Sequence, residues 1–501
     1  MQPYPRHILP NEPPHCHCPA KEAEPVYVFS AAHTTTTDQS GTDKVTIDVL
    51  PDDTLLEIFV FYRGDNEYFT TKMWKTLVHV CRKWRSVIFA SPRRLHLLLV
   101  CDSRTPVTRL LDIWPVWPIT IHYSPKDGEG EDNVVAALEC RDRISWIDFN
   151  ELTSQVSEKF VAVMEEPLPA LTGLHLHSND VMVPVIPDAF LAGSAPSLRY
   201  FSLEGIAFPA LHKFVVSAIH LTKLWLQRIP HAGYISPEMM VTCLAVLPNL
   251  EELSIGFQYP RAPQINSPPP TRTVLPTVTY FAFKGVSEYL EDLVARINTP
   301  KLHNLNISFF MDNIFTIPQL YNFIYRMERL KLRKRASMEL HPWSARIAVG
   351  SPPRLHLGFK CDRLDWRVSS MAQLCEQLSP FLSQVECLEI NGDPDIQAEL
   401  QDDIESTQWL ELFHPFRAVQ DLYVSKKLGL LVALGLQGLT GEGAAAVLPE
   451  LRNLSFGGLK PYTSVQEVIG PFVSARKLSD RPVFIARWEQ DPYWDAEDDT
   501  S

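Results

Sequence analysis

The residues best suited to chemistry in this sequence are four adjacent potential metal ligands, His15-Cys16-His17-Cys18. Imidazole and thiolate groups bind zinc, but a compact tetrahedral site normally takes a second pair of ligands from a distant part of the chain. No such pair stands out, and the cluster lies in a stretch with seven prolines in its first 25 positions. We therefore expect neither a metal ion nor a cofactor.

A glycine-rich loop is the second candidate, because the spacing Gly441-x-Gly443-x-x-Ala446 is similar to that of a dinucleotide-binding turn. In such a turn the glycines let the backbone approach a pyrophosphate at a helix N-terminus, within a strand–helix–strand unit. The motif has no clear unit of this kind and no acidic residue on a following strand. We interpret it instead as the start of a helix over residues 444–448.

Residues 326–335, RMERLKLRKR, contain six basic side chains and one acidic one. The run could be a nuclear localisation signal or a binding patch. Alternatively, since Leu330 and Leu332 alternate with basic residues, it could be a strand with a basic solvent face. We favour the strand, because short basic runs are common by chance.

Pairs of histidines and carboxylates are numerous, as sixteen histidines and fifty-nine carboxylates make inevitable. His175 and His177 alternate on one face of a predicted strand, where such residues lie when the other face is core. No Ser, His and Asp set, pair of catalytic carboxylates or phosphate-binding loop rises above this background. We predict that the protein is not an enzyme, although active sites can assemble from distant positions.

The composition narrows the function classes further. With 46 Lys and Arg against 59 Asp and Glu, the net charge is −13, which argues against general nucleic-acid binding. No apolar run approaches the length of a membrane span, and the N-terminus does not resemble a signal peptide. The nine cysteines are scattered and lie mostly among apolar residues. We expect a reduced cytoplasmic or nuclear compartment.

Two apolar helices joined by a charged loop are predicted in residues 47–92. The first begins at Pro51, followed by two acidic residues that favour the positive end of a helix, and residues 58–62 are all apolar. The second, over residues 70–89, aligns Leu77, Cys81 and Trp84 in one apolar stripe that Val80 widens. Seven basic residues and no acidic one lie between positions 72 and 94, which favours an acidic partner.

Beyond residue 94 a pattern apolar-x-x-apolar-x-apolar repeats. It occurs at Ile144-Ile147-Phe149, Leu171-Leu174-Leu176, Leu198-Phe201-Leu203, Leu221-Leu224-Leu226, Leu250-Leu253-Ile255, Val278-Phe281-Phe283, Leu302-Leu305-Ile307, Val385-Leu388-Ile390, Val419-Leu422-Val424 and Leu451-Leu454-Phe456. From 144 to 302 the starts lie 23 to 29 residues apart. This triplet and this interval are typical of leucine-rich repeats, in which a strand and a turn lead to a helix that returns to the next strand.

The intervening segments support repeat units, although irregular ones. Helices are predicted over 106–114, 132–139, 289–297 and 371–378, and looser strands at 95–99 and 119–123. Only the triplet at 171 is followed by asparagine at the expected place, Asn179. Between 331 and 359 the sequence indicates strands at 338–340 and 355–359 but no complete units. The proline-rich residues 260–277 are predicted to form a long loop.

Residues 47–92 resemble an F-box. The resemblance is carried by Leu50-Pro51, by the apolar residues of the first helix, and by Val80-Cys81-x-x-Trp84-Arg85. The whole chain is similar to the F-box/leucine-rich-repeat proteins abundant in basidiomycete fungi, through WKTLVHVCRKWRSVIFASPRRL at 74–95, LTGEGAAAVLPELRNL at 439–454 and RPVFIARWE at 481–489.

The composition, the repeats and the resemblance together predict an α/β fold with four parts. A disordered proline-rich tail (1–43) precedes a small helical F-box (45–92). An irregular leucine-rich-repeat solenoid with a curved parallel sheet (94–488) follows, and an acidic tail (489–501) ends the chain.

The resemblance also implies a docking function. In this family the F-box binds a Skp-type adaptor of a cullin-RING ubiquitin ligase, and the repeats recruit a protein substrate. The positions that match the motif are Leu50, Pro51, Leu55, Ile58, Phe59, Leu77, Val80, Cys81 and Trp84. Some of them must hold the small helical unit together and others must meet the adaptor, a division that the sequence leaves open.

The repeat strands are expected to line a concave surface, where solenoids usually bind partners. The candidate substrate contacts are the outward-facing strand residues His175, His177, Trp225, Gln227 and Lys284. An alternative hypothesis is a leucine-rich-repeat scaffold outside any ligase, with a degenerate F-box. The sequence does not identify the substrate under either hypothesis.

Overall fold

The computed structural model describes residues 49–63, 71–90, 97–103, 106–113, 116–127, 130–261, 271–310, 316–331, 334–350, 353–361, 363–392, 406–439, 442–457 and 464–488. The chain forms two compact units, Met1–Pro51 and Asp52–Ser501, and nearly all described residues belong to the second. The predictions for residues 1–43, with the His and Cys cluster, and for residues 489–501 lie outside the described residues.

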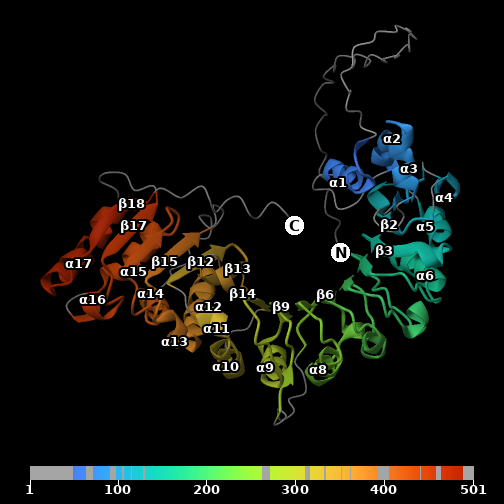
Figure 1. The fold of residues 1–501 in the computed structure, drawn as a ribbon. Coiled ribbons are helices and arrows are strands. Elements are labelled where there is room, and N and C mark those ends of the chain that lie inside the picture. The colour runs from blue at the N-terminus through green and yellow to red at the C-terminus, as the bar shows by residue number, and fades with distance from the viewer. Residues whose placement is uncertain are drawn as a thin grey trace, which may run out of the picture. The chain divides into compact units, whose positions relative to one another are not determined.

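Three helices, α1 (Asp52–Arg63), α2 (Thr71–Val78) and α3 (Arg82–Ala90), begin the second unit (Figure 1). Asp52 and Asp53 occupy the first turn of α1, as predicted. The prediction of one continuous helix over residues 70–89 is wrong, since α2 and α3 are separate helices.

Local hydrogen bonds explain the break between α2 and α3. The amides of the two residues after α2, His79 and Val80, donate to carbonyl groups three residues back, which tightens the end of the helix. Arg85 Nε donates to the Val78 carbonyl oxygen (2.9 Å), and the Trp84 amide donates to Cys81 Sγ (3.4 Å) at the start of α3. Because the chain turns here, Val80 leaves the predicted apolar stripe and is 50% exposed.

The rest of the described chain is built on one sixteen-stranded, mostly parallel sheet (Figure 1), which confirms the α/β class. Its strands, in spatial order, are β1 (Leu97–Val100), β2 (Ile119–Tyr123), β3 (Ile144–Phe149), β4 (Gly173–His177), β5 (Tyr200–Glu204), β6 (Lys223–Ile229), β7 (Glu252–Phe257), β9 (Tyr280–Gly285), β11 (Asn304–Phe309), β14 (Pro353–Lys360), β13 (Ser344–Gly350), β12 (Arg335–His341), β15 (Cys387–Gly392), β16 (Asp421–Val424), β17 (Asn453–Gly457) and β18 (Phe484–Trp488).

The repeated triplets predict the strands and their buried faces correctly. Leu174, Phe201 and Leu224, the second apolar positions of three successive triplets, are direct register partners on β4, β5 and β6. All three are fully buried. Since side chains alternate across a strand, the residues between the apolar positions lie on the other face of the sheet.

The sheet is not parallel throughout, which corrects the predicted all-parallel arrangement. Strand β13 is antiparallel to both β12 and β14, and it separates the two. The sequence predicts parts of β12 and β14 but not β13, whose residues SARIAVG do not match the triplet. Two antiparallel strand pairs, β12–β13 and β13–β14, therefore interrupt the strand–turn–helix order.

The prediction of a strand over the basic residues 326–335 is wrong. Arg326 ends α10 (Pro318–Arg326), Glu328–Lys331 forms α11, and β12 begins only at Arg335. Leu330, which we assigned to the core face of a strand, is instead a buried helical residue. Arg326, the charged residues of α11 and Arg335 consequently lie on three different elements.

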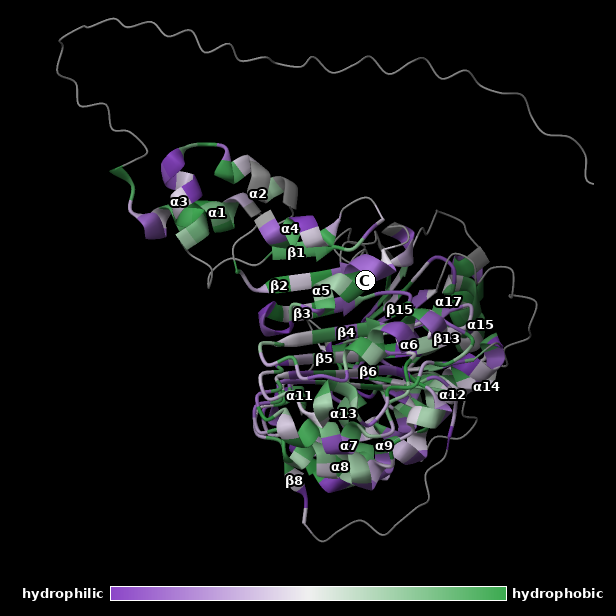
Figure 2. Cartoon of the chain, turned by 90° about the vertical axis from the view of Figure 1, so that its right-hand side faces the viewer, coloured by the Kyte–Doolittle hydropathy of each residue, from purple (hydrophilic) through white to green (hydrophobic). Residues whose placement is uncertain are grey.

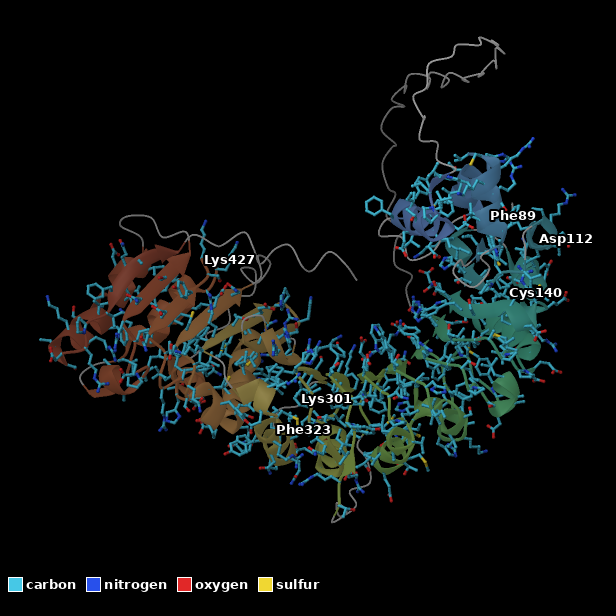
Figure 3. All side chains as sticks on the ribbon, viewed as in Figure 1. Phe89, Asp112, Cys140, Lys301, Phe323 and Lys427 are labelled. Carbon is cyan, nitrogen blue, oxygen red and sulfur yellow. The ribbon has the colours of Figure 1, made fainter. Side chains whose placement is uncertain are left out.

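The remaining helices pack along one face of the sheet (Figure 1), and the layer between them and the strands is filled by side chains such as Phe323 of α10 (Figure 3). They are α4 (Val107–Ile113), α5 (Glu131–Leu138), α6 (Ser154–Val163), α7 (Leu211–Phe214), α8 (Pro237–Ala245), α9 (Ser287–Arg296), α12 (Leu364–Gln377), α13 (Ser379–Leu382), α14 (Ser406–Phe413), α15 (Gly429–Gln437), α16 (Glu442–Ala446) and α17 (Ser464–Leu478). The predicted helices over 106–114, 132–139, 289–297 and 371–378 correspond to α4, α5, α9 and part of α12.

One predicted loop contains secondary structure. Within residues 260–277, Thr273–Val274 forms β8, which pairs with β10 (Ile297–Asn298) in a separate small sheet. Residues 262–270 of this loop lie outside the described residues.

Candidate functional site

The nine residues that match the F-box pattern divide by burial. Leu55, Phe59 and Leu77 are buried, Leu50, Cys81 and Trp84 are half-buried, and Pro51, Ile58 and Val80 are exposed. Phe59 packs edge-on against Trp84, with ring centroids 4.9 Å apart. The buried members form the core of the helical unit, and the exposed members do not belong to that core.

Helix α1 carries a second apolar face, which we call the α1 apolar face: Ile58, Phe61 and Tyr62. Their exposed fractions are 38%, 88% and 48%. The spacing i, i+3, i+4 places them on one side of the helix, which adjoins the side of the buried residues Leu55 and Phe59; Phe61 lies furthest from that pair. Figure 2 shows most of α1 in the hydrophobic colour. A helix that is apolar on two sides is suited to packing against a second protein.

A second surface is the face of the sheet opposite the helices, which we call the open face. All five predicted substrate contacts lie on it and are half-buried: His175, His177, Trp225, Gln227 and Lys284. They come from β4, β6 and β9, so the prediction of outward-facing strand residues is confirmed for each.

Aromatic side chains form one part of the open face. Trp146 stacks on Tyr200 with ring centroids 5.1 Å apart, and Trp225 meets Tyr200 edge-on at 5.9 Å. Gly173 lies between Trp146 and Tyr200 in the register, and a Cβ there would lie only 2.0 Å from the Trp146 ring. The absence of a side chain at Gly173 therefore permits the stacking. Trp225 is predicted from the sequence, whereas its aromatic neighbours Trp146 and Tyr200 are not.

A polar row crosses the next level of the strands. Asp148, His175 and Ser202 are successive register partners, the three residue types of a hydrolytic triad. The hydrogen bonds do not form a triad, however. The Asp148 oxygens bond to His122 Nδ1 (2.8 Å) and accept from Asn150 Nδ2 (2.9 Å).

His175 has no hydrogen bond to Asp148 or Ser202 in the described structure, and its buried Nδ1 has no partner among the described residues. Burial lowers the pKa of His175, which favours the neutral ring, while the nearby Asp148 opposes this effect. Ser202 is only 3% exposed. The row does not present an accessible activated nucleophile.

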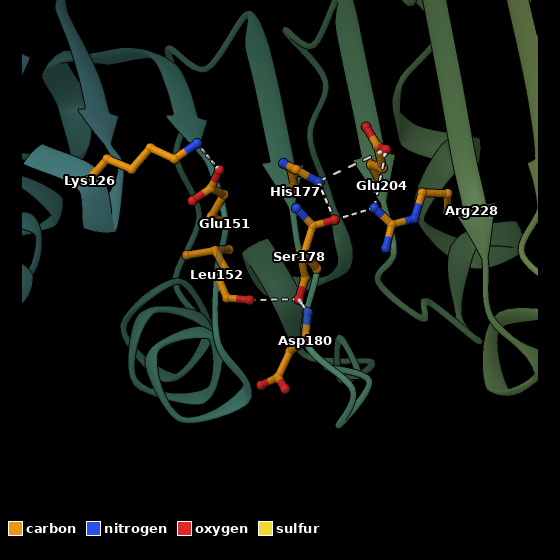
Figure 4. Close-up of polar contacts among 9 residues, drawn as sticks. Lys126, Glu151, Leu152, His177, Ser178, Asp180, Glu204 and Arg228 are labelled. Atoms are coloured by element: carbon orange, nitrogen blue, oxygen red, sulfur yellow. Dashed lines mark hydrogen bonds and ion pairs between the residues drawn. The ribbon is translucent and has the colours of Figure 1, made fainter. Parts of the chain in front are cut away.

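Charged residues cluster where β4, β5 and β6 end (Figure 4). His177 Nε2 lies 3.1 Å from Asn179 Oδ1 and 4.0 Å from Glu204 Oε1, and Arg228 Nη1 lies 3.6 Å from the same Glu204 oxygen. Arg228 also donates to Asn179. The backbone of Arg228 adopts a left-handed conformation (φ 50°) at an irregularity in the β6–β7 pairing, which keeps its side chain beside Glu204.

The last two predicted contacts differ in their partners. Gln227 donates to the Ser254 hydroxyl group. Lys284 has no ion-pair partner among the described residues. Burial and the nearby cations Lys360 and Arg228 lower the pKa of Lys284, and Glu204 opposes this effect.

Among the described residues, no group of three or more His, Cys, Asp or Glu side chains could hold a metal ion. The seven cysteines described are all free thiols. No described helix combines the length and apolarity that a membrane crossing requires.

Comparison with known proteins identifies no relative: no protein-family model matches the chain, and no curated protein is significantly similar to it.

Proposed function

We propose that this protein is a substrate-recruiting subunit of a cullin-RING ubiquitin ligase. In this proposal α1, α2 and α3 are an F-box that docks a Skp-type adaptor, which in turn binds the cullin scaffold. The long sheet is an irregular leucine-rich-repeat solenoid whose open face binds a protein substrate. The sequence resemblance indicates this class of ligase subunit, and the exposure of the α1 apolar face is the structural observation that best supports the proposal.

The α1 apolar face supports docking for a physical reason. Phe61 is 88% exposed although it belongs to a helix whose other side is packed. Burying one such side chain at an interface contributes about 1.5–3 kcal/mol, which corresponds to roughly a tenfold to hundredfold change in Kd. Basic residues on α3, among them Arg82, favour an acidic adaptor surface beside this face.

The protein itself would supply no bond-making group. It would raise the effective concentration of a substrate lysine near a ubiquitin-charged enzyme by holding both partners on one scaffold. The half-buried aromatic and charged residues of the open face are suited to contacts with a protein surface.

Affinity capture with a Skp-type adaptor from the same organism tests the docking step. We expect wild type to retain the adaptor and Phe61→Ser to lose most of it. Phe484→Ser on β18 is a matched control, because Phe484 is also highly exposed (70%). Equal capture by both variants, or no capture by wild type, would refute the docking proposal.

The alternative scaffold function predicts a different outcome in a second experiment. A protein captured by residues of the open face should become ubiquitinated, and its lifetime should shorten, when the full chain and the ligase components are present. A captured partner that is neither ubiquitinated nor shortened in lifetime would favour the scaffold outside any ligase.

A further inference from the structure

Lys284 lies on a floor of small residues in the middle of the open face. Its register partners are Gly256 on β7 and Ser308 on β11, and Ser308 in turn pairs with Gly358 on β14. Beyond Gly358 the next partner is Arg346 on β13. With strands about 4.8 Å apart, three strand spacings leave roughly 14 Å between the Lys284 and Arg346 backbones with no large side chain between them on this row.

The carboxylates at the two ends of this row are already paired with arginines. Glu204 lies 3.6 Å from Arg228, and Glu339 lies 2.7 Å from Arg346. Two lysines of this region, Lys284 and Lys360, are not part of these pairs, and neither has an ion-pair partner among the described residues. Although the chain as a whole carries −13, the described residues of this part of the open face therefore include two positive charges without an ion-pair partner.

A half-buried ammonium group beside other cations is costly, and an anion that binds there removes the cost. The unfavourable setting is visible in Lys284, whose pKa is lowered by burial first and then by Lys360 and Arg228. Between the two lysines the row consists of Ser308 and Gly358, neither of which has a bulky side chain that would stand between Lys284 and a bound anion.

The separation of the two lysines indicates what kind of anion fits. Lys360 lies two strands from Lys284 and two residues further along, which gives roughly 12 Å between their backbones. In an extended partner chain, two singly charged side chains at residues i and i+2 lie on the same side of the backbone, about 7 Å apart. Flexible lysine side chains can close the remaining distance to both.

We propose that Lys284 and Lys360 bind an extended acidic segment of the recruited protein, with carboxylates two residues apart. The lysine site, defined as Lys284, Lys360 and the floor of Ser308 and Gly358 between them, would recognise Asp or Glu side chains without any modification of the partner. This inference rests on the proposed function, because it takes the open face to be the surface that binds the substrate.

Fluorescence anisotropy with the full chain tests the lysine site. The probe is a short fluorescein-labelled peptide of alternating glutamate and glycine, measured at low and high salt. We expect Lys284→Gln/Lys360→Gln to weaken binding about tenfold or more, and high salt to weaken wild-type binding. Lys159→Gln/Lys213→Gln is the matched control, since it removes two positive charges from the exposed lysines of α6 and α7.

Three results would overturn the proposal. They are unchanged binding by the Lys284/Lys360 variant, equal weakening by the control variant, and binding only of a peptide in which phosphoserine replaces glutamate. Circular dichroism on each variant shows whether it is folded.

Adaptor capture from the same preparations separates the two proposals. Adaptor binding without peptide binding refutes the lysine site alone. The expected peptide binding without adaptor binding refutes the ligase function and leaves an acidic-peptide site in a different complex.

Discussion

Gly205 offers a sharp test of the packing beside the charged cluster of the open face. It follows β5 with a left-handed backbone (φ 68°), and a Cβ at this position would lie 2.2 Å from the Ser178 carbonyl oxygen. A left-handed alanine costs about 1–2 kcal/mol, and relief of a contact with backbone requires a strand end to move. We expect Gly205→Ala to lower the free energy of unfolding by roughly 2–4 kcal/mol.

Gly438→Ala is the control for this prediction. Gly438 has a helical backbone (φ −68°), and a Cβ there would meet nothing within 4 Å. The same chemical change should therefore be neutral or stabilise by up to about 1 kcal/mol. Urea unfolding followed by circular dichroism measures both variants, and hydrogen exchange of residues 200–229 localises the effect. If Gly205→Ala were as stable as Gly438→Ala, the close approach of β4 and β5 at this point would be wrong.

Two further predictions concern the helical unit and the hairpins. Phe59→Ala removes a fully buried ring that packs on Trp84, so it should lower the free energy of unfolding by about 3–5 kcal/mol. The amides of α1 and α3 should then exchange their hydrogens faster, and unchanged exchange there would contradict the packing. Glu339 has its pKa lowered to about 2 by the hydrogen bond from His341 and then by Arg346, against an ordinary value of 4.5. Because the pKa of Glu339 is lower in the folded state, its ionised form stabilises the fold above pH 4.5, and this stabilisation is lost as the pH falls towards 2. Since Glu339 is partly exposed, the contribution to the free energy of unfolding is about 1–2 kcal/mol. Glu339→Gln should abolish that part of the acid dependence in urea titrations at several pH values, and an identical pH profile would refute the assignment.

The repeated triplets predict much of the fold because they record burial directly. A residue such as Leu224 must be apolar to face the helices, and its interval from Leu253 reflects the length of one strand–helix unit. In β13 the alternating residues Ala345, Ile347 and Val349 are apolar and buried, but they lack the triplet, and an antiparallel hairpin also depends on the turns that flank it. The same reasoning explains why α2 and α3 were predicted as one helix. The break depends on Arg85 and Cys81 bonding to backbone atoms, and apolar spacing does not report such bonds.

The candidate surfaces could be predicted only in part. Alternation along single strands identifies His175, Trp225 and Lys284 as open-face residues, because it needs no knowledge of neighbouring strands. The stacking across Gly173 and the small floor beside Lys284 depend on register between segments that are distant in the sequence. Burial decides which positions of the predicted F-box pattern are exposed, and it depends on the packing of three helices against one another.

The most direct test of the central claim is calorimetric titration of the full chain with a purified Skp-type adaptor. The proposal predicts saturable one-to-one binding with a negative heat-capacity change, because apolar surface of α1 becomes buried. It also predicts that Phe61→Ser weakens the affinity roughly tenfold to hundredfold while Phe484→Ser leaves it unchanged. Absence of binding by wild type, or equal affinities of the two variants, would contradict the claim that α1 docks a ligase adaptor.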